Sequence, residues 1–228
     1  MKHHIPNFVT LLNLISGLLG LVFLLMNKPV LAAIMIFSAS LFDFLDGFVA
    51  RLLHATSPMG KELDSLCDLL SFGVLPGFLV FYYLNDQHFL SVENYYAFVG
   101  FLLPVFAALR LAKFNIDLNQ KTSFRGVPVP LSAWFFAAIP LIFNEYSVSW
   151  VLSPLFLIIS TVVFSFLMVS NISVMSMKFS DYSWAGNSSR YFLIFISLLS
   201  FVLIHFAAIP VIIIVCLILS QFYMSKIR

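Results

Sequence analysis

Charged residues are scarce in this sequence. Only 10% of the 228 residues are charged, whereas 61% are hydrophobic, and the mean hydropathy is +1.03. Such a composition excludes an ordinary soluble domain and predicts a membrane protein. The formal net charge of +2 is too small to indicate a nucleic-acid partner, so the basic residues are better explained by orientation in the membrane.

Cysteine is also rare. Cys67 and Cys216 both lie inside apolar runs, which is typical of small buried hydrophobic residues, so neither a disulfide framework nor redox chemistry is expected. A cleaved leader is not expected either. The first apolar run is longer than a signal-peptide core, and no small-x-small cleavage site precedes Asn27-Lys28-Pro29.

Long polar stretches are missing, so no separate soluble domain is expected. The apolar runs predict an all-α, polytopic helix bundle with eight transmembrane helices in a single domain, residues 1–228. The runs are Phe8 to Met26, Leu31 to Leu53, Leu63 to Leu84, Tyr95 to Phe114, Val127 to Phe143, Trp150 to Ser170, Tyr191 to Ala207 and Ile209 to Tyr223. The last break contains Pro210 and is compatible with either a tight hairpin or one kinked helix.

Basic residues collect on one side of this predicted bundle. With a cytoplasmic N-terminus, every lysine and arginine except Lys28 falls at or near the cytoplasmic side. The opposite loops carry Asp86, Glu93 and Glu145. The positive-inside rule therefore predicts eight spans with both termini in the cytoplasm, and we expect a multi-pass protein of the bacterial cytoplasmic (inner) membrane.

Four aspartates occupy two neighbouring predicted helices, although each costs about 2.5 to 3.5 kcal/mol on membrane-insertion scales. Asp43 and Asp46 share one helical stripe, and Asp64 and Asp68 share another. Asp43, Asp46 and Asp68 lie roughly 7 to 12 Å inward from the cytoplasmic helix ends at 1.5 Å per residue, so all four aspartates lie just below the cytoplasmic surface. Two divalent cations, Mg²⁺ or Mn²⁺, would balance four carboxylates, since such cations prefer hard oxygen ligands.

Two alternative roles for these aspartates are also compatible with their positions. One is a buried polar network without a ligand, and the second is a proton or cation pathway through a carrier. A carrier has no evident need for the small residues and the arginine that accompany the aspartates at regular spacing. These are Gly47, Ala50, Arg51 and Gly60.

The aspartates and these companions form one longer pattern. It reads Asp43-x-x-Asp46-Gly47-x-x-Ala50-Arg51, then eight residues, then Gly60-x-x-x-Asp64-x-x-x-Asp68. The pattern resembles the complete signature of the CDP-alcohol phosphatidyltransferase family. The resemblance implies that the aspartates bind two divalent metals that hold the pyrophosphate of CDP-diacylglycerol. It also implies that Gly47, Ala50 and Gly60 lie against the donor, and that Arg51 binds phosphate.

Further stretches resemble the membrane-spanning phosphatidylserine synthase branch of that family. They are Pro6-Asn7-x-x-Thr10-x-x-Asn13-Leu14, Asp64-Ser65-x-x-Asp68-x-x-Ser71-Phe72-Gly73-Val74-x-Pro76, Leu109-Arg110-Leu111-Ala112-Lys113-Phe114-Asn115, Phe124-x-Gly126-x-Pro128-x-Pro130 and Leu167-Met168-Val169-Ser170-Asn171. Lys113 departs from the arginine expected there. The resemblance ends near Lys178, and the last two predicted helices carry no motif.

The resemblance implies a reaction in which L-serine attacks CDP-diacylglycerol and releases CMP at the cytoplasmic face. Asp43, Asp46 and Asp64 would hold one metal, and Asp64 and Asp68 the second, with Asp68 also acting as general base. Inositol phosphate, glycerol phosphate and choline transferases share the aspartate signature, so the acceptor stays open, as does the choice between ester-linked and ether-linked donors. Family resemblance also implies a homodimer in contact with membrane lipid.

Several site residues also suit a simpler structural role. Asn13 is expected to contact CDP-diacylglycerol, but helix packing accounts for it equally well. Arg51 suits an interfacial anchor. Arg110 is the first choice for the serine carboxylate, although it lies near enough to a helix end to snorkel. Arg125 is the second choice, with a contact to an anionic headgroup or phosphate as its alternative.

Overall fold

The computed structural model describes residues 4–55, 57–86, 94–116, 124–174 and 184–225. Helices dominate this part of the chain, as the sequence predicted. They are α1 His4–Leu25, α2 Pro29–Leu52, α3 Pro58–Asp68, η1 Leu69–Val74, α4 Leu75–Leu84, η2 Tyr95–Phe101, α5 Leu102–Ile116, α6 Val129–Tyr146, η3 Ser149–Leu152, α7 Pro154–Val169, α8 Trp184–Ile204, η4 His205–Ala207 and α9 Ala208–Ser225.

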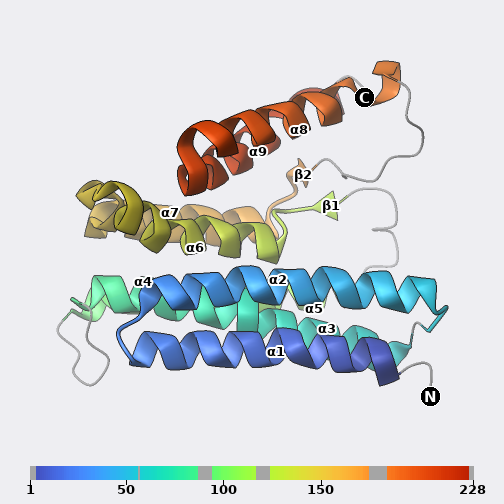
Figure 1. Ribbon diagram of the computed structural model, residues 1–228, viewed down its shortest axis with the longest axis horizontal. Helices are drawn as coiled ribbons and strands as arrows, with labels where there is room; N and C mark the ends of the chain where they lie inside the picture. The colour runs from blue at the N-terminus through green and yellow to red at the C-terminus, as the bar shows by residue number, and fades with distance from the viewer. Residues whose placement is uncertain (1–3, 56, 87–93, 117–123, 175–183, 226–228) are drawn as a thin grey trace.

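The helices pack in layers. Figure 1 shows α1 to α5 in the lower part of the bundle, α6 and α7 above them, and the inclined pair α8 and α9 on top. Contacts between α2 and α6, α5 and α7, and α6 and α9 join these layers. The interior contains large buried side chains such as Phe72, Tyr82 and Phe136. The outer face of α8 instead exposes large apolar side chains, including Leu198 and Val202, as expected for a surface in contact with lipid.

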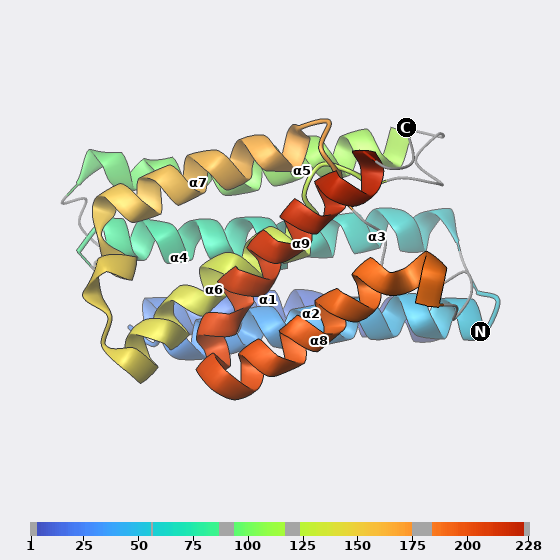
Figure 2. The same cartoon turned by 90° about the horizontal axis from the view of Figure 1, so that it is seen from above.

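Each of the eight predicted apolar runs contains helix. By length and hydropathy, five described segments qualify as membrane spans, and Pro154–Val169 is a shorter apolar helix. The five are His4–Leu25, Pro29–Leu52, Pro58–Leu84, Tyr95–Ile116 and Tyr191–Gln221. The last of these contains the turn at η4, where His205 has a positive φ, so α8 and α9 form the tight hairpin (Figure 2). The number of membrane crossings and the side of each terminus stay predictions.

The rod from Pro58 to Leu84 begins five residues before the apolar run that predicted it. Ser57 caps it, because its Oγ accepts a hydrogen bond from the Gly60 N–H at 3.0 Å, and Pro58 suits the first helical turn. Directly after Asp68 the rod widens into the π-helical turn η1. Pro76 then occupies the first turn of α4, where its missing N–H is tolerated.

A short antiparallel pair interrupts the helical pattern. β1, Phe124–Arg125, pairs with β2, Ser173–Val174. The chain then turns at Gly126, whose φ of +77° favours glycine and whose N–H donates to the Ile172 carbonyl at 2.8 Å. These contacts join the segment before α6 to the segment after α7. The segment before α6 borders the site described next.

Candidate active site

Three of the four predicted aspartates converge. Asp43 on α2 and Asp64 and Asp68 on α3 each offer a carboxylate oxygen, and these oxygens lie within 4.8 Å of one another. The residues meet because α2 and α3 follow one another across a short turn and both pack against α1. Three carboxylates so close together repel one another in a medium of low dielectric, so the cluster requires a compensating positive charge.

Asp46 lies beside this cluster. It is buried at 6% exposure, and its Oδ2 has no hydrogen-bond partner among the described residues. The buried Oδ1 of Asp64 is also unpaired within the described part of the chain. Unpaired buried carboxylate oxygens are costly unless something binds them. Clustered carboxylates with free oxygens are the donor set that a divalent cation prefers, so the residues fit the metal that the sequence predicted.

Asp68 is held from behind by α1. Its Oδ1 accepts a hydrogen bond of 3.1 Å from the Asn13 amide, and the Ser71 hydroxyl donates to the Asn13 main-chain carbonyl at 3.1 Å. Gly17 makes this approach possible, because a Cβ there would stand 2.5 Å from the Ser71 Oγ. The close packing of α1 against η1 thus fixes the orientation of a carboxylate that is itself only 8% exposed.

Two cavities flank the aspartates. The first has a volume of about 210 Å³ and the second about 220 Å³. The first cavity is lined by Pro6, Asn7, Thr10, Asp46, Gly47, Ala50, Ala55, Ser57, Gly60, Lys61 and Asp64. The second cavity is lined by Lys61, Asp64, Ser65, Asp68, Arg110, Leu111, Phe114, Asn115, Pro128 and Pro130. Lys61 and Asp64 therefore belong to both cavities, which places Asp64 at their junction, whereas Asp43 lines neither cavity.

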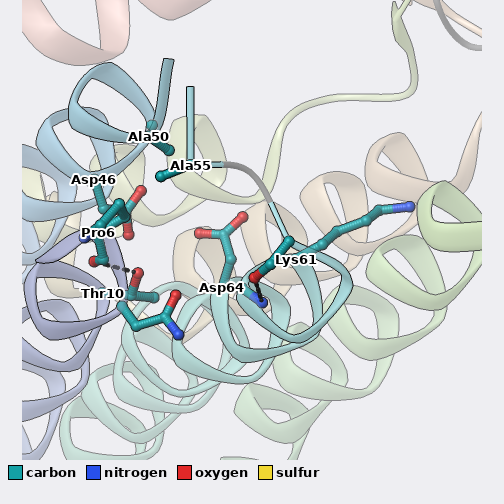
Figure 3. Close-up of a pocket in the computed structure, with 11 residues that line it drawn as sticks. Pro6, Thr10, Asp46, Ala50, Ala55, Lys61 and Asp64 are labelled. Atoms are coloured by element: carbon teal, nitrogen blue, oxygen red, sulfur yellow. Dashed lines mark hydrogen bonds between the residues drawn. The ribbon is translucent and has the colours of Figure 1, made fainter. Parts of the chain in front are cut away.

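The first cavity collects the small residues of the predicted donor site. Gly47, Ala50 and Gly60 all line it, whereas Arg51 and Asn13 do not. Figure 3 shows Asp46 and Asp64 on opposite sides of this cavity, with Lys61 extending away from both. The Arg51 guanidinium folds back along its helix, since a Cβ on Gly47 would lie 3.7 Å from one of its nitrogens.

The second cavity contains the predicted acceptor residue Arg110. Its Nε is buried and has no hydrogen-bond partner among the residues that the structure describes. The second predicted residue, Arg125, contributes its backbone to β1, and its side chain lies outside the described residues. Pro128 and Pro130 show that the segment after Arg125 borders this cavity.

Sequence reasoning missed Lys61 and Asn115. Lys61 was interpreted only as a basic residue near the membrane surface, yet it lines both cavities and its Nζ donates to the Asn115 carbonyl at 3.1 Å. Its position three residues before Asp64 was the available signal, because residues at that spacing share a helix face. Asn115 belongs to the stretch from Leu109 to Asn115 that resembles the family, but the neighbouring sequence does not indicate which way its side-chain amide points.

The fold and site define a membrane-embedded helix bundle with an acidic metal-type centre between two cavities. Residues 3–179 match the CDP-alcohol phosphatidyltransferase family. The chain therefore belongs to that family. Helices α8 and α9 lie beyond the matched segment.

Three relatives carry informative names. A CDP-diacylglycerol–serine O-phosphatidyltransferase of Bacillus subtilis (strain 168) is 37% identical over 75% of this chain and 89% of the relative. A Methanocaldococcus jannaschii protein of the same name is 37% identical over 66% of this chain and 67% of the relative. An archaetidylserine synthase of Methanothermobacter thermautotrophicus is 34% identical over 57% of this chain and 54% of the relative. For the Helicobacter pylori (strain ATCC 700392 / 26695) and Mycobacterium leprae relatives, the matched share of their length is 59% and 58%.

Proposed function

We propose that this protein transfers the phosphatidyl group of CDP-diacylglycerol to L-serine and so produces phosphatidylserine and CMP. The observation that carries this proposal is the pair of cavities that meet at Asp64. A two-substrate transfer needs two binding spaces with the reacting groups at their junction. The serine-transferring relatives named above support the choice of reaction.

The first cavity suits the nucleotide part of the donor. Gly47, Ala50 and Gly60 present little side-chain bulk, so a pyrophosphate can approach the helix backbones closely. Arg51 stands at the end of α2 beside Gly47, where a guanidinium can bind a phosphate oxygen. The lipid chains then leave sideways between the helices, since the outer faces of the bundle are apolar.

The second cavity suits a small acceptor. Directional polar side chains, including those of Arg110 and Asn115, line this cavity, and a few placed polar groups of this kind fix the orientation of one small molecule. Arg110 offers a buried, unpaired Nε, and a guanidinium can hold the serine carboxylate through parallel hydrogen bonds. Arg125 is the second candidate for this contact.

Asp68 is placed for proton removal. It lines the second cavity and accepts the Asn13 hydrogen bond on one oxygen. In the proposed step, the serine oxygen forms a bond to the lipid-bearing phosphorus, the bond from that phosphorus to the CMP oxygen breaks, and the hydroxyl proton passes to Asp68. A serine hydroxyl is a weak nucleophile at neutral pH, so a carboxylate within reach accelerates its attack.

Asp43, Asp46 and Asp64 would hold one divalent cation, and Asp64 and Asp68 the second, with Mg²⁺ or Mn²⁺ as the ions of choice. When bound, these ions would neutralise the charge of the pyrophosphate and the charge that develops on the departing CMP. Asp46 and Asp64 face the first cavity from two different helices, so cations held by them would attract the pyrophosphate into that cavity.

The decisive assay follows CMP release by the purified protein with CDP-diacylglycerol and Mn²⁺. Serine, inositol phosphate, glycerol phosphate and choline are supplied separately, and an ether-linked donor is included because of the archaetidylserine relative. We expect release with serine above all other acceptors. Release with inositol phosphate or glycerol phosphate but not serine would overturn the acceptor. Ion transport by the reconstituted protein without any CMP release would favour a carrier instead.

We further propose that the aspartate end of the bundle faces the cytoplasm. Arg51, Lys61 and Arg110 lie near that end, whereas Asp86 and Glu145 follow α4 and end α6 at the other (Figure 1). Cysteine labelling at residues 86 and 145 checks this orientation. External labelling of both residues is expected, and labelling from the cytoplasm at either would overturn it.

A further inference from the structure

The side-chain amide of Asn115, near the end of α5, is held in one orientation. Its Nδ2 donates to the Ser65 Oγ at 2.9 Å and to the Glu62 carboxylate at 3.4 Å. The Ser65 hydroxyl has a single hydrogen, which it donates to the Lys61 carbonyl at 3.2 Å, so its oxygen accepts the hydrogen bond from Asn115. A carboxylate such as Glu62 also only accepts. Both hydrogens of the amide therefore point toward α3, and the Oδ1 points away from these two partners.

This Oδ1 is buried and has no hydrogen-bond partner among the described residues. Asn115 lines the second cavity. A buried carbonyl oxygen without a donor is unfavourable, and native structures satisfy nearly all such groups. The missing partner must therefore be a donor that enters from outside the described side chains, and the second cavity is the space available to it.

The same cavity contains an unpaired group of opposite kind. Arg110 presents a buried Nε–H without an acceptor among the described residues, five positions before Asn115 on α5. Asp64 and Asp68 also line the cavity, but the proposed function assigns both to metal binding. Apart from these aspartates, the Asn115 Oδ1 is thus the buried acceptor oxygen that has no donor among the described polar side chains of this cavity.

We propose that Asn115 recognises the α-ammonium group of the acceptor and so makes the site selective for an amino acid over other small hydroxy acids. This inference rests on the proposed transfer to serine. The carboxylate of the amino acid meets Arg110, its ammonium group donates to the Asn115 Oδ1, and its hydroxyl lies toward Asp68. An acceptor without the amino group leaves the Oδ1 unpaired, and that penalty is the source of the selectivity.

Acceptor analogues that lack one group at a time give the test. 3-Hydroxypropionate is serine without the amino group, and ethanolamine is serine without the carboxylate. For the unaltered protein with CDP-diacylglycerol and Mn²⁺, we expect kcat/KM for serine to exceed that for 3-hydroxypropionate by roughly tenfold or more, as for a lost hydrogen bond to a charged group. Equal use of the two acceptors would overturn the inference without any variant.

Variants then assign this selectivity to Asn115. In Asn115→Ala and Asn115→Leu, we expect kcat/KM to fall about tenfold for serine and to stay unchanged for 3-hydroxypropionate. Asn115→Asp keeps an acceptor oxygen and should retain the preference for serine. Ile116→Ala is the matched control, because Ile116 is the next residue on α5 and is 80% exposed.

The outcomes distinguish a failure of the role given to Asn115 from a failure of the proposed transfer to serine. A parallel loss with both acceptors in Asn115→Ala would show a merely structural role and overturn the inference. A loss confined to ethanolamine and serine, with 3-hydroxypropionate spared, would support it. Absence of CMP release with serine in the unaltered protein would instead refute the proposed function, whatever the variants do.

Discussion

The two cavities share Asp64 and Lys61 but otherwise differ in the kinds of residue that line them. The first cavity is bordered by small residues from α2 and α3, with backbone close to its surface. The second cavity is bordered by long or directional side chains from α3 and α5 and by prolines at the start of α6. Small residues let a phosphate group approach the backbone closely, whatever lipid is attached to it. Hydrogen-bond donors and acceptors in fixed positions instead select one small molecule. Donor tolerance and acceptor selectivity are therefore expected in separate halves of one site.

The largest effect should come from Asp64, the acidic residue common to both halves. Asp64→Asn removes a charged ligand at the junction, so we expect it to abolish CMP release. Asp43→Asn and Asp46→Asn should behave alike. Asp86→Asn, the same change at the opposite end of the bundle, serves as control and should be active. Full activity of the unaltered protein in excess chelator would contradict the metal assignment.

Asp68→Asn should separate chemistry from binding. The rate of turnover should fall by roughly 10²- to 10⁴-fold, the range of a lost general base, while donor affinity stays within about tenfold. Single-turnover kinetics together with equilibrium binding of CDP-diacylglycerol measure the two quantities. A parallel collapse of donor binding would make Asp68 chiefly a metal ligand and place the base elsewhere.

Arg110 should affect only the second cavity. Arg110→Lys keeps a positive charge but loses the planar donor pair, so the serine KM should rise roughly tenfold, and Arg110→Ala should raise it further. The KM for CDP-diacylglycerol should stay unchanged in both. A normal serine KM in both variants would remove Arg110 from the acceptor site.

The smallest expected effect belongs to the first cavity. Ala50→Leu adds bulk where the donor is proposed to lie, so the KM for CDP-diacylglycerol should rise by a few-fold to about tenfold while the serine KM is unchanged. Initial rates with each substrate varied in turn measure both constants. A rise in the serine KM instead would mean that the two substrates are assigned to the wrong cavities.

The first cavity could be predicted from the sequence to a large extent. Its aspartates and small residues recur at helical spacing on two helices joined by a short turn, so local periodicity was enough to place Gly47 with Asp46 and Gly60 with Asp64. The helical character of every apolar run was confirmed for the same reason. Start positions were less accurate, because Lys61 and Glu62 are polar yet helical, and hydropathy gave no sign of them.

The second cavity depends on contacts between residues about fifty positions apart. The hydrogen bond from Asn115 to Ser65 and the bond from Lys61 to the Asn115 carbonyl exist only once α3 and α5 are packed. The same holds for Asn13, which was predicted to touch the donor and whose amide contacts Asp68 across the α1–α3 interface. Pattern and spacing within one helix carry no information about such partners, so their roles required the structure.

The π-helical turn η1 has a consequence for how this chain can vary. One extra residue in a turn rotates everything before it by about 100° relative to everything after it. The face of α3 that carries Asp64 and Asp68 is thereby set independently of α4, where Leu75, Leu79 and Tyr82 are buried in the bundle. Deleting Leu70 would restore an ordinary helical phase, turn the carboxylates away from the junction and break the Asn13–Asp68 hydrogen bond. The π-helical turn thus sets the direction of the reactive groups relative to the buried face of α4.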